Sequence, residues 1–180
     1  MAKLVLINGA PGSGKSTLAQ LLAQDEPLTL ALDIDVIKHS LGQWETALPA
    51  SGLVARRLAV AMITDHLGNG YDVIVGQFLA RTEFIEELEA LAKSLGADFV
   101  ELVLRVDEPI LRTRLAHRAL HPERSEHVIN STLVGPDDAL NLVTAINNLV
   151  ILRPTCTVID ANDSPATTVT HLRTALAGGI

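Results

Sequence analysis

The chain has 180 residues, of which 48% are hydrophobic and 19% are charged, so a globular domain with a sizeable core is expected rather than a disordered chain. Its 14 lysines and arginines stand against 21 aspartates and glutamates, which gives a net charge of −7, and only 3% of the residues are aromatic. Both numbers argue against a nucleic-acid partner, because such proteins need a basic groove and aromatic surfaces for stacking.

Neither a membrane span nor a disulfide is expected. No apolar run approaches the roughly 20 residues that cross a bilayer, and the first three residues lead directly into an apolar run, which leaves no room for a signal peptide. Cys156 is the single cysteine, so an internal disulfide and a cysteine-based zinc cluster are excluded, and we interpret Cys156 as a small core residue. A cytoplasmic location is therefore expected, whereas the sequence does not indicate the oligomeric state.

The first predicted strand, 4–7, leads into a glycine-rich loop. This loop, residues 9–16, reads GAPGSGKS and fits the phosphate-binding pattern G-x-x-x-x-G-K-[ST]. The good helix formers of residues 17–23 follow it, so the motif lies between a strand and a helix, as its chemistry requires. Lys15 can reach the β- and γ-phosphates of a nucleotide, and the Ser16 hydroxyl can ligate Mg²⁺. The predicted nucleotide-binding residues of this loop are Gly12, Ser13, Gly14, Lys15, Ser16 and Thr17.

Apolar runs alternate with helical patterns along the rest of the chain. The strand-like runs are 4–7, 28–32, 73–75, 99–106 and 157–159. This alternation predicts an α/β fold, a five-stranded parallel sheet with helices on both faces, in a single domain that covers residues 1–180. Ligands of such sheets bind at the carboxyl ends of the strands, so the loops that follow the strands are expected to form the site.

Two aspartates, Asp33 and Asp35, follow the second predicted strand. Their carboxylates lie on one side if the strand continues through them. An enzyme that phosphorylates a hydroxyl needs a carboxylate to accept its proton, and Mg²⁺ needs oxygen ligands. We therefore predict Asp35 as the general base and Asp33 as a metal ligand that acts with Ser16 through water. The alternative is that Asp35 only caps a helix that begins at Val36.

The region 36–57 follows these acids and is the predicted acceptor-binding wall. Trp44 lies outside the strongly periodic segments, so it either stacks on an acceptor or closes a small satellite core. In this interpretation Arg56, or its neighbour Arg57, binds an anionic group of the acceptor. The alternative for at least one of them is that it lies on the surface in contact with solvent.

The third predicted strand ends in Gly76-Gln77, where many phosphate-loop proteins carry an aspartate that assists Mg²⁺. The metal would then depend on Ser16, Asp33, the phosphates and water. Gln77 can orient a water or an acceptor hydroxyl. Arg81, at the start of a predicted helix over 82–95, either faces the acceptor or lies in solvent.

A helix is predicted to begin around 107–109, because acids and a proline occupy its first turn. Arg114 and Arg118 share one face of it, which suits a polyanion. The polar stretch 119–127 is predicted to form a mobile lid that carries Arg124 and excludes water from the nucleotide. The histidines of this region match no strong zinc pattern, so a metal site there is not favoured; they are His117, His121 and His127. Beyond the last strand, the loop before a helix capped by Ser164 lies where an adenine would rest.

These motifs resemble the single-domain P-loop kinases, a group that includes shikimate and gluconate kinases, chloramphenicol phosphotransferase, the zeta-toxin kinase core and the kinase half of polynucleotide kinase. The matching segments are residues 9–17, 33–35, 111–118 and 159–165, the third of which resembles the R-L-x-x-R entry to the lid. The resemblance implies a three-layer P-loop NTPase fold with a small lid, a base at Asp35, Arg114 near the adenine and Arg118 on the phosphates. It is specific to the superfamily rather than to one substrate, and Gly76-Gln77 departs from several relatives.

The sequence thus predicts an ATP- and Mg²⁺-dependent phosphotransferase that acts on a hydroxyl of a small metabolite or antibiotic-like molecule, with Lys15, Asp35 and Arg118 as its catalytic residues. Two enzyme alternatives remain, a nucleoside or nucleotide kinase and a 5′-hydroxyl polynucleotide kinase. A third alternative is a non-catalytic ATP-binding regulator. A guanine-reading Asn-Lys-x-Asp motif is absent from the sequence, which argues against a GTPase-type switch.

Overall fold

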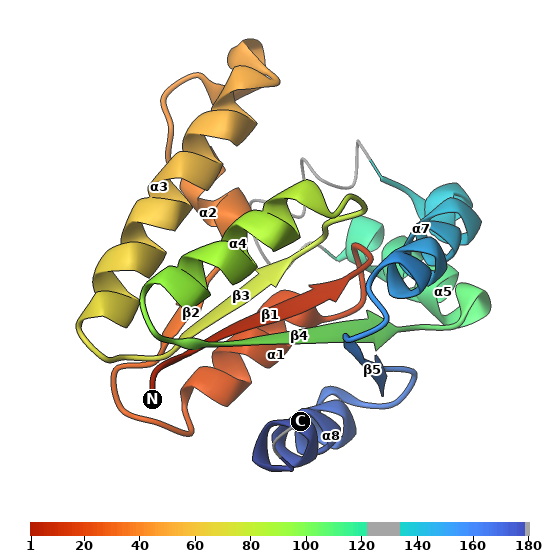
Figure 1. The fold of residues 1–180 in the computed structure, drawn as a ribbon. Coiled ribbons are helices and arrows are strands. Elements are labelled where there is room, and N and C mark those ends of the chain that lie inside the picture. Colours follow the sequence, from red (N-terminus) through yellow and green to blue (C-terminus); the bar gives the residue numbers. More distant parts are fainter. Residues whose placement is uncertain (122–133, 179–180) are drawn as a thin grey trace.

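Five parallel strands form a single sheet, as predicted (Figure 1). The computed structural model describes residues 1–121 and 134–178. In sequence order the strands are β1 (Lys3–Gly9), β2 (Leu30–Leu32), β3 (Val73–Gln77), β4 (Asp98–Arg105) and β5 (Thr157–Asp160). Their order across the sheet is β2-β3-β1-β4-β5, so β1 lies in the centre and is almost wholly buried. This explains why it reads as a continuous apolar run rather than an alternating one.

The second strand is shorter than its apolar run. Leu28 has a φ of +64°, in the left-handed region, and its side chain is largely exposed. A residue in that conformation cannot continue a parallel ladder, so β2 begins at Leu30. It also ends at Leu32, before the two aspartates, so the condition under which both carboxylates would lie on one side of a strand is not met.

Helices cover both faces of the sheet (Figure 1). Two of them, α1 (Lys15–Ala23) and α8 (Pro165–Ala177), pack against each other on one face, and α3 (Ala50–Gly68) and α4 (Glu83–Ser94) do so on the other. The remaining helical elements are α2 (Ile34–His39), η1 (Trp44–Ala47), α5 (Glu108–Leu120), η2 (Pro136–Asp138) and α7 (Ala139–Leu152). Within the described residues, no helix is long and apolar enough to cross a bilayer.

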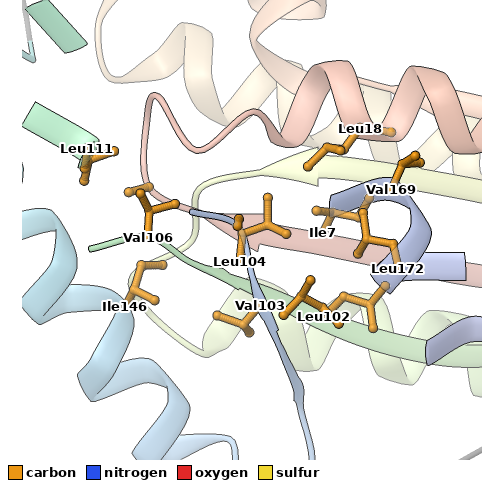
Figure 2. Packing of buried hydrophobic residues seen from close by; sticks show 14 of the residues in the cluster. Ile7, Leu18, Leu102, Val103, Leu104, Val106, Leu111, Ile146, Val169 and Leu172 are labelled. Atoms are coloured by element: carbon orange, nitrogen blue, oxygen red, sulfur yellow. The ribbon is translucent and has the colours of Figure 1, made fainter. Parts of the chain in front are cut away.

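Buried side chains on the two faces form two clusters that hold the layers together. Figure 2 shows part of one cluster, in which Ile7 and Leu104 of the sheet lie with Leu18 of α1 and Leu172 of α8. All four of these side chains are at most 2% exposed, and full burial of a leucine or isoleucine contributes about 1.5–3 kcal/mol. Cys156 packs against the same cluster, as predicted, and burial raises the pKa of its thiol.

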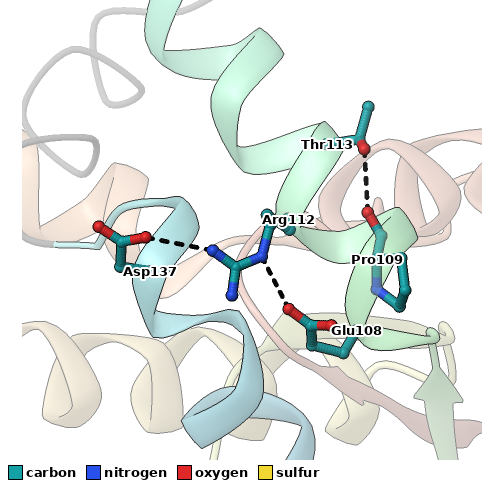
Figure 3. A network of polar contacts seen from close by, with 5 residues as sticks. All are labelled: Glu108, Pro109, Arg112, Thr113 and Asp137. Carbon is teal, nitrogen blue, oxygen red and sulfur yellow. Dashed lines mark hydrogen bonds and ion pairs between the residues drawn. The ribbon is translucent and has the colours of Figure 1, made fainter.

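The helix α5 is tied to the segment that follows residues 122–133. On the exposed side of α5, Arg112 Nε donates to Glu108 Oε1 at 2.8 Å, and Arg112 Nη1 lies 3.1 Å from Asp137 Oδ1 in η2 (Figure 3). The predicted lid, 119–127, begins inside α5, which continues to Leu120, and Arg124 and His127 lie outside the described residues.

Candidate active site

The phosphate-binding loop connects β1 to α1 through two glycines that have left-handed backbones. Gly12 has a φ of +86° and Gly14 a φ of +91°, and a Cβ on Gly12 would lie 3.2 Å from Leu115 of α5. Only glycine meets both requirements at low cost. The helix α1 then begins at Lys15, so its unpaired N–H groups and the positive end of its dipole lie at the loop. The Ser13 side chain is buried, and its hydroxyl has no partner within the described residues.

Lys15 extends back over this loop. Its Nζ lies 3.4 Å from the carbonyl oxygen of Ala10. Burial lowers the pKa of the Lys15 ammonium to about 8; the negative charges of Asp33 and Asp35 oppose this shift, and the positive charge of Arg118 adds to it. An anion bound in the loop would favour the charged form of Lys15.

Asp33 connects the loop to the second strand. Ser16 Oγ donates to Asp33 Oδ2 at 2.8 Å, and the other carboxylate oxygen accepts from the backbone N–H of Asp35 at 2.9 Å. Asp33 is therefore the N-cap of α2, which explains why the chain turns from strand to helix at this residue. The predicted alternative, a cap formed by Asp35, is wrong, because Asp35 already lies in the first turn of the helix.

Asp35 faces a different set of groups. Lys38 Nζ donates to Asp35 Oδ1 at 2.9 Å and lies 5.1 Å from the centre of the Trp44 ring. His39 packs on the same ring, with 4.4 Å between the ring centroids. Trp44 is 8% exposed. It therefore forms the satellite core that we considered as one alternative, and its buried ring is not a free surface on which an acceptor could stack.

Arg114 of α5 organises the loop that follows β5. Its Nη1 donates to the carbonyl oxygen of Ala161 at 2.8 Å, and its Nη2 donates to those of Asn162 and Asp163, both at 2.9 Å. Arg114 thus holds the loop in which we expected the adenine, and it lines a hollow there together with Gly12, Gly14 and Pro165.

Arg118 has donors that nothing in the described residues accepts. Its Nε and Nη2 are buried and have no partner there, and burial lowers the pKa of the guanidinium. Arg118 lines a cavity of about 400 Å³ over the loop. The loop contributes Gly12, Gly14, Lys15, Ser16 and Thr17 to this cavity, and α5 contributes Thr113, Arg114, His117, Arg118 and His121. Two buried guanidinium donors that no described residue accepts, beside an ammonium, form the electrostatic arrangement that a polyphosphate would complete.

The remaining predicted acceptor residues have different surroundings. Gln77, at the end of β3, has a buried Oε1 without a partner in the described part of the chain. Arg56 lies 5.0 Å over the Phe84 ring in another cleft. Arg81 is exposed and forms no hydrogen bond or ion pair with a described residue. The described residues contain no group of three potential metal-binding side chains, and the His117 and His121 rings pack on each other at 4.8 Å.

Sequence reasoning missed two residues of this region. Asn8 is fully buried; its Oδ1 accepts from the N–H groups of Gly9 and Leu79, and its Nδ2 donates to the Leu79 carbonyl, so it joins the end of β1 to the loop after β3. The signal was a single amide at the end of an apolar run, immediately before the glycine-rich loop. Lys38 was also missed, although it lies three residues after Asp35, within one helical turn.

Comparison with known proteins places the chain in a family. The family model AAA_33, described as an AAA domain, matches residues 4–134. The adenylate kinase of Deinococcus deserti is 30% identical over 139 residues, which are 72% of this chain and 71% of that protein. The gluconokinase of Sinorhizobium meliloti superposes with a TM-score of 0.57 and 19% identity, over 98% of this chain and 90% of its own. The tunicamycin resistance protein of Deinococcus radiodurans does so with a TM-score of 0.56 and 16% identity, over 100% and 98%.

The two solved structures support the predicted P-loop fold, and the family model and the curated relative support the predicted class of enzyme. The chain therefore belongs to the AAA_33 family, and it is an ATP-dependent P-loop kinase.

Proposed function

We propose that the protein transfers the γ-phosphoryl group of ATP to a hydroxyl of a small molecule, with Mg²⁺ as its metal. The observation that carries this proposal is that two neighbouring carboxylates have different partners: Asp33 accepts a hydrogen bond from Ser16 beside the loop, whereas Asp35 accepts one from Lys38 and is close enough to Lys15 for its charge to act on that ammonium. One carboxylate is thus available to a metal and the other to an acceptor.

The oxygen atoms of Ser16 and Asp33 fit Mg²⁺. They are hard ligands, they lie 2.8 Å apart, and Ser16 lines the cavity that contains Lys15. When bound, Mg²⁺ would neutralise charge on the phosphates. As the sequence predicts, Ser16 would be a direct ligand and Asp33 would act through water, because residue 77 is a glutamine and supplies no carboxylate.

The transfer itself requires little covalent chemistry from the protein. The acceptor oxygen forms a bond to the γ-phosphorus, the bond from that phosphorus to the β,γ-bridging oxygen breaks, and ADP leaves. Asp35 receives the proton of the acceptor hydroxyl. Lys15 and Arg118 stabilise the charge that spreads over the transferred group.

A nucleotide kinase is the second candidate, because the curated relatives are named adenylate kinases. A phosphorylated acceptor would favour a convergence of Arg56, Arg57 and Arg81. Only the first two line one cleft, and Arg81 is not among its lining residues. We therefore rank this candidate below a small-molecule acceptor without a phosphate.

The test is ADP release from Mg-ATP with a panel of acceptors that includes sugars, sugar acids, aminoglycosides, nucleosides, AMP and a 5′-hydroxyl oligonucleotide. A true acceptor should raise the rate about a hundredfold or more over the background with water. Asp35→Asn should lower this rate by about 10²–10⁴ without weakening ATP binding. The control Asp98→Asn lies at the start of β4, at the amino-terminal ends of the strands, and should change neither the rate nor ATP binding. Normal turnover by Asp35→Asn would remove the base assignment, and a flat panel with tight ATP binding would support the regulator.

A further inference from the structure

A cleft lies between the first turns of α3 and α4 and has a volume of about 500 Å³. Its apolar part comes from both helices. Phe84 of α4 is buried at its base, and Leu53 and Val54 come from α3. Leu53 is 60% exposed, so an apolar surface is open to solvent here. Arg56 extends over the Phe84 ring at 5.0 Å, and this contact joins the two helices across the cleft.

Charges of both signs line the same cleft. Arg56 and Arg57 come from α3, and Glu83 and Glu87 come from α4. Within residues 1–121 and 134–178, none of the four takes part in an ion pair, although two cations and two anions share one cavity. The charges of the cleft therefore sum to zero, yet each remains available to a ligand.

The topology places this cleft on the acceptor side of the sheet. The helix α4 begins six residues after Gln77, the last residue of β3, so its first turn lies near the carboxyl ends of the strands. The helix α3 ends just before β3 begins, so its first turns lie at the other end of the helix, toward the carboxyl edge. It also packs against α2, which carries Asp35. Figure 1 shows α3 and α4 on the same face of the sheet.

We propose that this α3–α4 cleft binds the body of the phosphoryl acceptor, and that the acceptor is an amphipathic zwitterion, with an apolar group, an acidic group and an amine besides its reacting hydroxyl. The proposal rests on the proposed function and narrows its substrate class. The acidic group of the ligand pairs with Arg56 or Arg57, the amine pairs with Glu83 or Glu87, and the apolar group packs on Leu53 and Val54.

A nucleoside monophosphate fits this cleft poorly. Its phosphate carries close to two negative charges at neutral pH, and Glu83 and Glu87 would repel it while Arg56 and Arg57 attract it. A ligand that contains both signs satisfies all four side chains. The charges of the cleft thus favour a zwitterionic acceptor over the nucleoside monophosphate that the names of the curated relatives suggest.

Four matched probes test the proposal, because they share a phenyl-substituted carbinol and differ only in charge. They are β-phenylserine with both charges, β-hydroxy-β-phenylpropionate with the carboxylate alone, β-hydroxyphenethylamine with the amine alone, and α-methylbenzyl alcohol with neither. Dissociation constants are measured by ligand-observed NMR with a non-hydrolysable ATP analogue saturating the nucleotide loop, and AMP is the fifth compound. We expect the zwitterion to bind about fivefold more tightly than either singly charged probe, as exposed ion pairs allow, and more tightly than AMP.

Charge-neutral variants assign the binding to the cleft. Glu87→Gln should remove the advantage of β-phenylserine over the carboxylate probe, and Arg57→Gln should remove its advantage over the amine probe. The matched controls Glu86→Gln and Lys93→Gln also lie on α4 but outside the cleft, and both should keep the wild-type order. Tighter binding of AMP, equal binding of the four probes, no binding at all, or identical effects of the variants and their controls would each overturn the proposal.

The same proteins report separately on the proposed function. ATP binding and ADP release with the acceptor panel depend on Lys15 and Asp35, and neither residue lines the α3–α4 cleft. If β-phenylserine bound preferentially but did not raise ADP release, the zwitterion site would stand, and its ligand would not be the acceptor of the kinase. Acceptor-dependent ADP release with a compound that lacks one of the two charges would support the kinase and contradict the zwitterionic acceptor.

Discussion

Ser16 and Asp33 lie in different parts of the chain, and their side chains meet in a hydrogen bond of 2.8 Å. Ser16 is the second residue of α1, and Asp33 is the N-cap of α2. The bond therefore joins the starts of two helices that follow β1 and β2, strands that β3 separates in the sheet. It also holds two oxygen atoms side by side next to Lys15, where a divalent cation on a nucleotide would need them.

Asp33→Asn should weaken the binding of Mg²⁺ and leave the fold intact. The amide oxygen can still accept from the N–H of Asp35, so the cap of α2 persists, but the anionic oxygen next to Ser16 is lost. We expect the Mg²⁺ concentration for half-maximal ADP release to rise by about 10- to 100-fold. Binding of metal-free ATP should not change, and this is the internal control. An unaltered Mg²⁺ titration would exclude Asp33 from the metal site.

The lowered pKa of Lys15 predicts a pH dependence of nucleotide binding. The ammonium form binds the phosphates, and it predominates below a pKa of about 8 in the free protein. As the pH rises through this value, free Lys15 becomes neutral and binding must recover a proton. The dissociation constant of metal-free ATP should therefore increase roughly tenfold between pH 7 and pH 9.

Calorimetric titration across this pH range measures the effect. The matched control is Lys15→Arg, whose guanidinium stays charged throughout and whose ATP binding should vary far less with pH. If the wild-type protein and this variant followed the same pH profile, the titrating group would be something other than Lys15.

Arg114 and Arg118 share one face of α5, but we expect substitution of Arg114 to affect stability and substitution of Arg118 to affect turnover. Arg114 donates three hydrogen bonds to the backbone of residues 161–163, whereas two donors of Arg118 have no partner in the described residues. Arg114→Gln should lower the free energy of unfolding by about 1–3 kcal/mol and raise the KM for ATP. Arg118→Gln should leave the free energy of unfolding nearly unchanged and lower kcat by about 10²–10³.

Thermal unfolding and steady-state kinetics on the two variants separate these effects. A chain of this size loses about 2–4 °C in Tm for each kcal/mol, so the loss in Arg114→Gln is measurable. Equal Tm losses in both variants would mean that Arg118 is a structural residue rather than one reserved for the phosphates.

The predictions that held were those that depend on local spacing. The glycine-rich loop places Lys15 at a helix start through its own backbone, and the four-residue interval between Arg114 and Arg118 places both on one helix face, whatever the rest of the chain does. The sheet followed from the alternation of apolar runs with helical patterns, and the observed strand ends differ from the predicted ones by at most two residues.

The failures concern residues whose contacts depend on how the chain folds around them, at short range for Asp33 and Trp44 and at long range for Asn8. The sequence could not show that Asp33 would cap its own helix, so that the strand ends at Leu32, three residues before Asp35. Trp44 was ambiguous because its burial depends on how His39 and Lys38 fold back onto its ring. Asn8 was overlooked because its partner, the backbone of Leu79, lies 71 residues away.

Gly76 shows how closely the nucleotide loop is packed against the third strand. A Cβ at Gly76 would lie 3.2 Å from the carbonyl oxygen and 3.3 Å from the carbonyl carbon of Lys15. These are backbone atoms, so they can give way only if α1 moves away from β3. Such overpacking costs about 1–3 kcal/mol, and the shift would carry Lys15 and Ser16 away from Asp33. Gly76→Ala should therefore lower both the Tm and kcat.

Gly52→Ala is the matched control. Gly52 lies inside α3, and a Cβ there meets nothing within 4 Å, so the substitution should raise the free energy of unfolding by about 0.5–1 kcal/mol through helix propensity alone. Denaturant unfolding and ADP release with both variants test the comparison. If Gly76→Ala retained both stability and turnover, α1 and β3 would be free to separate without disturbing the loop, and the close approach at Gly76 would not be what positions Lys15.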